Sequence, residues 1–566
     1  MKKTVSKKKS NIDSKILYPA LIFAVWLISY FICQIVFPHN LAWDEVAYLS
    51  VGRGIAENFD FGARSYTVMG LLNYGYPTHL IHYPLCSLFI ALFFKLFGSS
   101  LTVGYLSTWV AALGVCLLIY FIFLLLSENN HKLSFLVSMS YLFFPSILKN
   151  CDSGMMEQFA NLLLCLFVYL ILRDYVKGNF NYLTLLKFVL SFLVLWLYKT
   201  IYVGYLFGAF VLICMAYISK ITGKKLNTKI PLPVFLGLAF SIFAVLFYVF
   251  KNYVFYPLAP MVNFSAQQEA RQVYAEFLGG AFNNFPHNIL SNLHYFFTVV
   301  VKSYFIYPTT LAPATGEYAS FEKSILATSC CYVLDGVYFL GLILMILFAV
   351  TSWSKLKPQE KLFISFSFTA IITVNLIMFT IMKTYHENLW RYNTYYLPLY
   401  LCSMWILLKE QIVYFKPFIS EHPRASKALV FIFFIFLYLP LFISSIKHYI
   451  AYEYNFHMRA KFNAEIVKSA IKNEKPEFIY FNDGIHSTFT DYPIKQVFKD
   501  ATNEQLLKVN KILPKPIEYL FLRPGDWLFN SNQEQILKGL PILNEQYVMY
   551  GFQKESQTVI YKLANS

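Results

Sequence analysis

Long apolar stretches separated by short polar loops make up most of the chain before residue 447. A run of about 20 apolar residues can cross a bilayer as a helix, and the first such run, Ile16–Phe37, follows the lysine-rich start Lys2–Lys9. The pattern predicts an α-helical polytopic membrane protein with about eleven spans. The other predicted spans are Leu101–Leu126, Leu133–Leu148, Phe159–Leu172, Leu185–Leu197, Ile201–Ile218, Pro231–Val254, Tyr332–Val350, Phe363–Ile381, Tyr395–Leu408 and Leu429–Ile446.

Two shorter apolar segments, Pro84–Phe97 and Tyr295–Tyr307, fall below span length and are predicted to lie at the membrane interface. With that choice, basic loops such as Lys220–Lys229 face the cytoplasm together with the N-terminus, as the positive-inside rule requires. Residues 1–446 then form a membrane domain with external loops at 38–100, 149–158, 256–331 and 383–392.

After about Lys447 the chain has no apolar run of span length. Short β-type and helical patterns there predict a small extracytoplasmic α/β domain over residues 447–566. The predicted strands are Phe478–Phe481, Glu518–Arg523, Tyr547–Phe552 and Thr558–Leu563, and the predicted helices are Asn503–Ile512 and Asn532–Leu537.

Composition supports the membrane class, because 57% of the residues are hydrophobic and only 14% are charged. The net charge of +16 resides largely in short loops between spans, so nucleic acid is not an expected partner. The 9 cysteines show no pairing pattern of a zinc site or a disulfide framework. The first apolar segment is longer than the core of a cleaved signal peptide and is interpreted as a retained span.

Acids and bases of the predicted external loops gather at one face of the membrane. Adjacent carboxylates, Asp44 and Glu45, follow the first span directly. Charges at one rim, over spans almost free of charge, favour a site at the water–lipid boundary rather than a path through the bilayer. A simpler interpretation of the pair stays open, since acids also suit the positive end of a helix dipole.

Several motifs in this order resemble glycosyltransferases of the GT-C superfamily, in the branch of the protein O-mannosyltransferases and lipid A aminoarabinose transferases. They are Trp43-Asp44-Glu45-Val46-Ala47-Tyr48, the Tyr83-Pro84-Leu85 entry into an apolar helix that ends in Lys-Leu-Phe-Gly, the acidic second external loop, and Arg391-Tyr392. The resemblance covers roughly Ile16–Leu408. It implies a polyprenyl-phosphate-linked sugar donor and transfer on the external face.

The resemblance assigns Asp44 as the general base of an inverting transfer, with Glu45 orienting the acceptor or starting a helix. It assigns Arg391, Lys199 and His82 to the donor phosphate, where a cation would balance the charge of the leaving group. Each of these three also has a structural interpretation: Arg391 and Lys199 as interfacial anchors, and His82 as a structural histidine. His82 stands where some relatives carry a basic residue before a Pro-Pro pair.

The same resemblance assigns contacts with the sugar or acceptor to Asp152, Glu157, Tyr48 and Tyr392. For the two acids the alternative is a solvated loop, with Glu157 at the start of a helix.

No cofactor is expected beyond the lipid-linked donor itself, and no metal, because the histidines and carboxylates lack the spacing of a dedicated site. The expected partners are membrane lipid, the donor, and a glycan, lipid or protein acceptor. The expected location is a bacterial inner membrane. A transporter or flippase of a lipid-linked saccharide is the rival interpretation, and it would predict charges at mid-membrane or inverted repeats.

Overall fold

The structure is a computed structural model of the 566-residue chain. It describes residues 14–36, 43–60, 65–68, 71–72, 84–144, 147–148, 151, 157–179, 187, 194, 340–341, 343–381, 394–421, 423–425, 428, 465–472, 474–481, 494–498, 501–522, 546–553 and 558–564.

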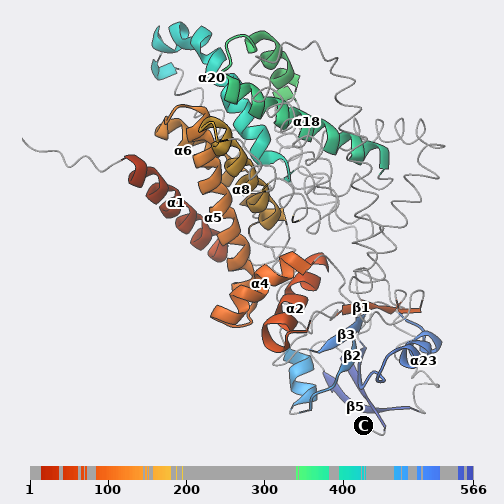
Figure 1. The fold of residues 1–566 in the computed structure, drawn as a ribbon. Coiled ribbons are helices and arrows are strands. Elements are labelled where there is room, and N and C mark those ends of the chain that lie inside the picture. Colours follow the sequence, from red (N-terminus) through yellow and green to blue (C-terminus); the bar gives the residue numbers. More distant parts are fainter. Residues whose placement is uncertain are drawn as a thin grey trace, which may run out of the picture.

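A bundle of helices forms the larger part of the described structure (Figure 1). Three of its helices are long and apolar enough to cross a membrane, and lie in α1, α5 and α8. The helix bounds are α1 Ser14–Val36, α2 Trp43–Asn58, α4 Pro84–Phe97, α5 Leu101–Leu126, α6 His131–Leu142, α8 Glu157–Val176, α18 Pro358–Ile381 and α20 Leu397–Glu421.

The hydrophobic pattern locates several of these helices to the residue. α4 and α5 have the bounds predicted for the interfacial segment and the second span. Ser100 caps α5 by accepting a hydrogen bond from the backbone N–H of Val103, which satisfies one of the free donors of the first turn.

Several helices do not end with their predicted spans, and two of the differences have a clear cause. The predicted span Leu133–Leu148 breaks after Leu142, because Pro145 disfavours helical backbone at the residue before it. α20 runs past its apolar part to Glu421, since Lys409 and its neighbours Glu410 and Gln411 are good helix formers. Loss of hydropathy therefore marks the end of a membrane segment but not the end of a helix.

Other predicted elements lie outside the described residues. They are Ile201–Ile218, Pro231–Val254, Tyr295–Tyr307, Leu429–Ile446 and Asn532–Leu537, together with nearly all of Leu185–Leu197.

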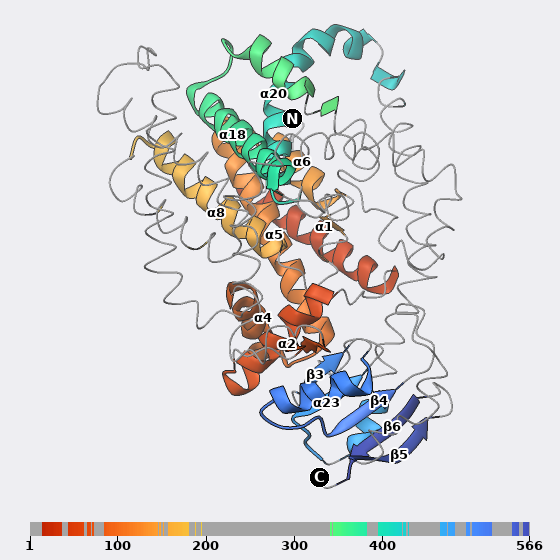
Figure 2. The same ribbon diagram turned by 90° about the vertical axis from the view of Figure 1, so that its right-hand side faces the viewer.

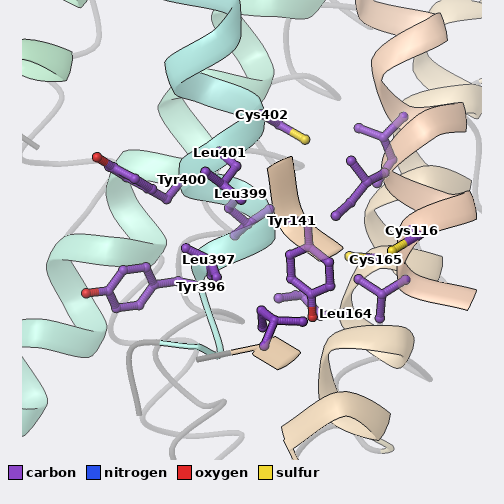
Figure 3. Packing of buried hydrophobic residues seen from close by; sticks show 14 of the residues in the cluster. Cys116, Tyr141, Leu164, Cys165, Tyr396, Leu397, Leu399, Tyr400, Leu401 and Cys402 are labelled. Atoms are coloured by element: carbon purple, nitrogen blue, oxygen red, sulfur yellow. The ribbon is translucent and has the colours of Figure 1, made fainter. Parts of the chain in front are cut away.

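α5 is the centre of the bundle and contacts α8, α6, α4 and α1. Small residues allow these close approaches. A Cβ at Gly114 would lie 2.5 Å from Cδ1 of Leu162 in α8. Trp26 of α1 donates its indole N–H to the backbone oxygen of Trp109 in α5 at 2.8 Å. Figure 3 shows Tyr141 between residues of α20, such as Leu399, and Cys165 of α8.

The described residues include a sheet of six strands in the order β1-β3-β2-β4-β6-β5, and all of them except β1 come from the C-terminal part of the chain. The strands are β1 Ser65–Thr67, β2 Phe478–Phe481, β3 Lys495–Phe498, β4 Tyr519–Leu522, β5 Tyr547–Gln553 and β6 Thr558–Leu563. β1, β3, β2 and β4 run parallel, whereas β6 and β5 form an antiparallel hairpin. The four predicted strands are confirmed within one residue; β3 and β1 were not predicted.

A hydrophobic core covers each face of this sheet. On one face the helix α23, Asn503–Ile512, buries Leu506 and Val509 against residues such as Phe478. The start of α23 is held by a capping box between Thr502 and Gln505. On the other face, the helical residues 465–471 cover Ile479, Phe481 and Phe521.

The edge strand β1 comes from the first predicted external loop, more than 400 residues before its neighbour β3. Its residue Tyr66 and the following Val68 and Leu71 are buried in the core beneath α23. Full burial of an apolar side chain of this size contributes about 1.5–3 kcal/mol. The C-terminal sheet is therefore completed by a segment outside the predicted 447–566 domain.

The pairing of β1 with β3 also restricts the topology. Hydrogen-bonded strands lie on one side of a membrane, so an even number of spans must separate them. The predicted topology satisfies this condition when Pro84–Phe97 does not cross.

At the end of the bundle away from the sheet, Lys357 forms an ion pair with Glu128 at 2.5 Å, and Lys409 forms one with Glu360 at 3.2 Å. We call the end of the bundle with these two ion pairs the far end. The sheet end is the end where α2 and α4 lie between the bundle and the sheet (Figures 1 and 2).

Candidate active site

The acid pair lies in the first turn of α2. Asp44 and Glu45 directly follow Trp43, the first residue of that helix. The N–H groups of a first helical turn have no intrahelical partner and carry partial positive charge, which favours carboxylates nearby. The side chains at 44 and 45 lie outside the described part of the structure. Their predicted catalytic and helix-start roles are therefore both compatible with this backbone position.

One turn further along, α2 packs closely on α4 and α5. The hydroxyl of Ser87 in α4 donates to the backbone oxygen of Tyr48 at 3.3 Å. A Cβ at Gly52 would lie 2.8 Å from Cγ2 of Ile90, and one at Gly104 would lie 2.5 Å from Cδ2 of Leu49. Contacts this tight hold the middle of α2 against α4 and α5.

Tyr48 itself is buried, with 3% of its surface exposed. Its place is the interface between α2 and the bundle. Contact of its side chain with sugar or acceptor stays a prediction.

α4 connects α2 with the start of α8. Its Phe89 lies against Phe159 of α8, with ring centroids 4.3 Å apart. The two rings are tilted by 59°, a geometry that aromatic pairs favour. The middle of α2, α4 and the first turn of α8 therefore belong to one packed unit at the sheet end.

Glu157, the first residue of α8, is fully buried. Its Oε1 accepts a hydrogen bond from the hydroxyl of Tyr395 at 3.1 Å. A buried carboxylate is costly unless it is hydrogen-bonded. Glu157 is therefore buried and not solvated, while its predicted place at the start of a helix is confirmed. Its predicted contact with the sugar or acceptor stays a prediction.

A network of buried side chains continues from this carboxylate. The hydroxyl of Tyr141 in α6 donates to Oε1 of Gln158 at 2.9 Å and accepts from Nδ2 of Asn161 at 3.0 Å. The same Nδ2 donates to the backbone oxygen of Thr394 at 2.9 Å. These bonds join α6, α8 and the turn just before α20 at the sheet end. They lie just after the acidic loop that contains Asp152 and just after the loop that contains Arg391.

The network was not predicted from the sequence, although part of its signal was present. Glu157 and Asn161 are four residues apart and share one face of a helix. Polar residues at this spacing in an apolar span are costly unless they find partners. Nothing in the sequence pointed to Tyr141, Thr394 or Tyr395 as those partners.

The remaining predicted site residues lie outside the described part of the chain. They are His82, Asp152, Lys199, Arg391 and Tyr392. Within the described part, no group of three His, Cys, Asp or Glu side chains could hold a metal ion.

Comparisons with known proteins give several similar solved structures, two of which belong to one protein. A scan of protein-family models finds no match, and a search of curated proteins finds none either. The crystal structure of ArnT from Cupriavidus metallidurans bound to undecaprenyl phosphate is 11% identical, covers 96% of this chain and 98% of its own, and has a TM-score of 0.40. The apo structure of the same ArnT is 12% identical, with coverages of 97% and 98% and a TM-score of 0.39.

These scores and identities describe a loose correspondence along the whole chain. The three span-length apolar helices make the chain an integral membrane protein.

Proposed function

We propose that this chain is a membrane glycosyltransferase of the GT-C type. It moves a sugar from a polyprenyl-phosphate donor to the hydroxyl or amine of a glycan, lipid or protein, on the external face of the membrane. The observation that carries the proposal is the gathering of α2, whose first turn contains Asp44 and Glu45, with the buried Glu157–Tyr395 network at the sheet end of an apolar bundle.

The proposed chemistry begins at Asp44. Its carboxylate takes the proton of the acceptor as the acceptor atom attacks the anomeric carbon. The bond from that carbon to the phosphate oxygen breaks on the opposite face, and the electron pair leaves with the lipid phosphate. Inversion at the anomeric carbon follows from this in-line geometry.

Negative charge grows on the phosphate as its bond to the sugar breaks, and nearby cations lower the energy of that state. Arg391 has a planar guanidinium that binds two phosphate oxygens at once, with Lys199 and His82 as further donors. Asp152, Glu157, Tyr48 and Tyr392 are proposed to contact or border the sugar and acceptor.

The environment proposed for this reaction is a bacterial inner membrane. The N-terminus is cytoplasmic, and the C-terminal domain lies outside with the site. The donor is the only small molecule required, and no metal or other cofactor takes part.

The rival function is a transporter or flippase of a lipid-linked saccharide. In the three span-length helices, Asp174 and Arg173 lie in the last turn of α8 and Glu157 in its first turn. Charges at span ends fit a site at the membrane boundary better than a pathway across it.

The test compares purified wild-type chain with Asp44→Asn in the transfer of labelled sugar from a polyprenyl-phosphate donor pool to membrane acceptors. Asparagine keeps the shape of the side chain but removes the base, so we expect donor binding to persist and turnover to fall by about 100-fold or more. Glu45→Gln is the matched control, with a smaller loss if that residue only orients the acceptor.

Unchanged transfer by Asp44→Asn would refute the assignment of the base. Absence of transfer by the wild type, together with donor translocation in vesicles, would favour the transporter.

A further inference from the structure

We propose that β1 tethers α2 to the C-terminal domain and thereby positions the acid pair, so that Tyr66, Val68 and Leu71 are positioning residues for the transfer reaction. This inference rests on the proposed function. It gives the C-terminal domain a role in aligning the site, instead of a separate role in binding the acceptor.

The first step is the strength with which β1 is held. Its three residues pair in parallel with β3 along Gln496, Val497 and Phe498. The ring of Tyr66 lies 6.4 Å from that of Phe478. The segment is therefore anchored both by backbone pairing and by the hydrophobic core.

Burial adds to this anchoring. Tyr66, Val68 and Leu71 expose 5%, 0% and 1% of their surfaces, and pack with residues from β2, β3, β4 and α23. A short loop segment that needed only to cross from α2 to α4 would not require three buried apolar side chains. The pattern instead makes this part of the loop a structural member of the C-terminal domain.

The second step is the short distance along the chain between α2 and β1. α2 ends at Asn58, and β1 begins at Ser65. Seven residue steps span at most about 25 Å when fully extended. The end of α2 is itself fixed, because the N–H of Phe59 bonds to the oxygen of Ile55 and that of Asp60 to the oxygen of Gly54, both at 3.1 Å.

The third step is the rigidity of α2 between its two ends. Arg53, which is buried, forms an ion pair with Glu57 at 2.8 Å in the last turns of the helix. The opposite end of the same helix holds Asp44 and Glu45. A helix fixed by α4 and α5 along its middle and by β1 beyond its end cannot pivot, so the position of the domain is transmitted to the acids.

Displacement of a catalytic group by about 1 Å can reduce a rate by about 100-fold. A tether that removes the pivoting of α2 therefore affects turnover more than binding of the donor. Loosening the tether should lower kcat, while KM for the donor stays nearly constant.

The decisive variant lengthens the tether and leaves the core of the domain intact. Six Gly and Ser residues are inserted between Phe61 and Ser65 of the full-length chain. A matched control receives the same insertion between Gln553 and Thr558, in the β5–β6 hairpin of the same domain. We expect the first insertion to lower kcat at least 10-fold with donor KM within threefold of wild type, and the control to retain transfer within twofold.

Hydrogen–deuterium exchange provides a readout that does not depend on activity. With the tether lengthened, amides of α2 should exchange faster, while those of β1 and of Val68 stay protected. Val68→Asp, which should detach the segment, is expected to expose both regions, and Val68→Ile to retain wild-type protection and transfer.

Each outcome separates the two proposals. Wild-type exchange in α2 after the first insertion, or kcat equal to that of the control, would overturn the tether. Faster exchange in α2, in a chain whose wild type transfers no sugar, would support the tether and reject the proposed function. If Val68→Asp fails to fold, the two insertions still decide the question.

Discussion

Glu157 has two candidate roles, contact with the sugar or acceptor and positioning of the neighbouring loops. The surroundings of its carboxylate show how the two roles can be tested. The carboxylate is buried and accepts a hydrogen bond from the hydroxyl of Tyr395. Tyr395 is the second described residue after the loop that contains Arg391. Removing one partner of a buried hydrogen bond costs about 1–3 kcal/mol. A residue bound in this way can position the loops on either side of it without touching the substrate.

We predict that Tyr395→Phe lowers transfer about 10-fold. The residues that follow the Asp152 loop and the Arg391 loop would no longer be connected through the hydrogen bond to Glu157. The matched control is Tyr120→Phe, which removes a hydroxyl bonded to Nδ1 of His131 at 2.7 Å, near the far end. Initial rates and the thermal unfolding midpoint are measured for both variants. Equal losses of transfer in the two would show that the Tyr395 hydroxyl acts only through general stability.

A second residue-scale feature is the charge cluster at the edge of the C-terminal sheet. A hydrogen bond from Lys562, assisted by one from Tyr519, lowers the pKa of Glu474 below its ordinary value of 4.5. Because the folded state has the lower pKa, this interaction stabilises the domain above pH 4.5, and the contribution is lost as the pH falls through the folded value.

We therefore predict that Glu474→Gln lowers the unfolding temperature at pH 7, and that the difference from wild type is smaller at about pH 3, because Glu474 loses its charge as the pH falls through its lowered folded pKa. Scanning calorimetry of the full-length chain at the two pH values provides the measurement. A difference at about pH 3 as large as that at pH 7 would mean that the ion pair does not account for the effect.

At the scale of elements, the contact of α2 with α4 is set by a small residue. Gly52 allows the two helices to approach until a Cβ would lie 2.8 Å from Ile90 and 3.2 Å from the backbone oxygen of Ser87. Backbone atoms cannot move aside as the end of a flexible side chain can, so an added methyl group must separate the helices.

Gly52→Ala should destabilise the chain by about 1–3 kcal/mol through overpacking and reduce transfer, because α2 carries the acid pair. Gly551→Ala is the control, since its Cβ would meet nothing nearer than Ile560 at 3.9 Å. Thermal unfolding and transfer rates are compared for the two. An equally mild effect at both glycines would show that α2 and α4 are less closely fixed than the structure indicates.

At the scale of the whole molecule, the polar connections lie at two opposite ends of the bundle. Glu128, Lys357, Glu360 and Lys409 meet at the far end, whereas Glu157 and the paired strands β1 and β3 lie at the sheet end. This arrangement agrees with the division of the loops between two sides that the predicted topology makes.

Labelling of single added cysteines decides the orientation. Glu128 and Lys508 have side chains that are 67% and 60% exposed and lie at opposite ends. In intact cells, a membrane-impermeant thiol reagent should label Lys508→Cys and leave Glu128→Cys unlabelled until the cells are opened. The unaltered chain measures the background of the native cysteines. Labelling of both positions from outside would overturn the topology.

The sequence by itself determined the elements whose signal is local. The apolar pattern and the capping residues predict where α4, α5, α23, β2 and β6 begin and end. Burial in lipid or in a protein core depends on the side chains of the element itself, so the signal is local. The resemblance to GT-C transferases likewise came from short motifs, and the roles of Asp44 and Arg391 remain predictions based on it.

Only the tertiary structure decided which distant segments meet. The three residues of β1 are too few to give a periodic signal, and their partner lies beyond ten predicted spans. The burial of Glu157 likewise depends on Tyr395, 238 residues away. Contacts of this kind follow from the way in which the chain packs as a whole, so no local pattern in the sequence contains them.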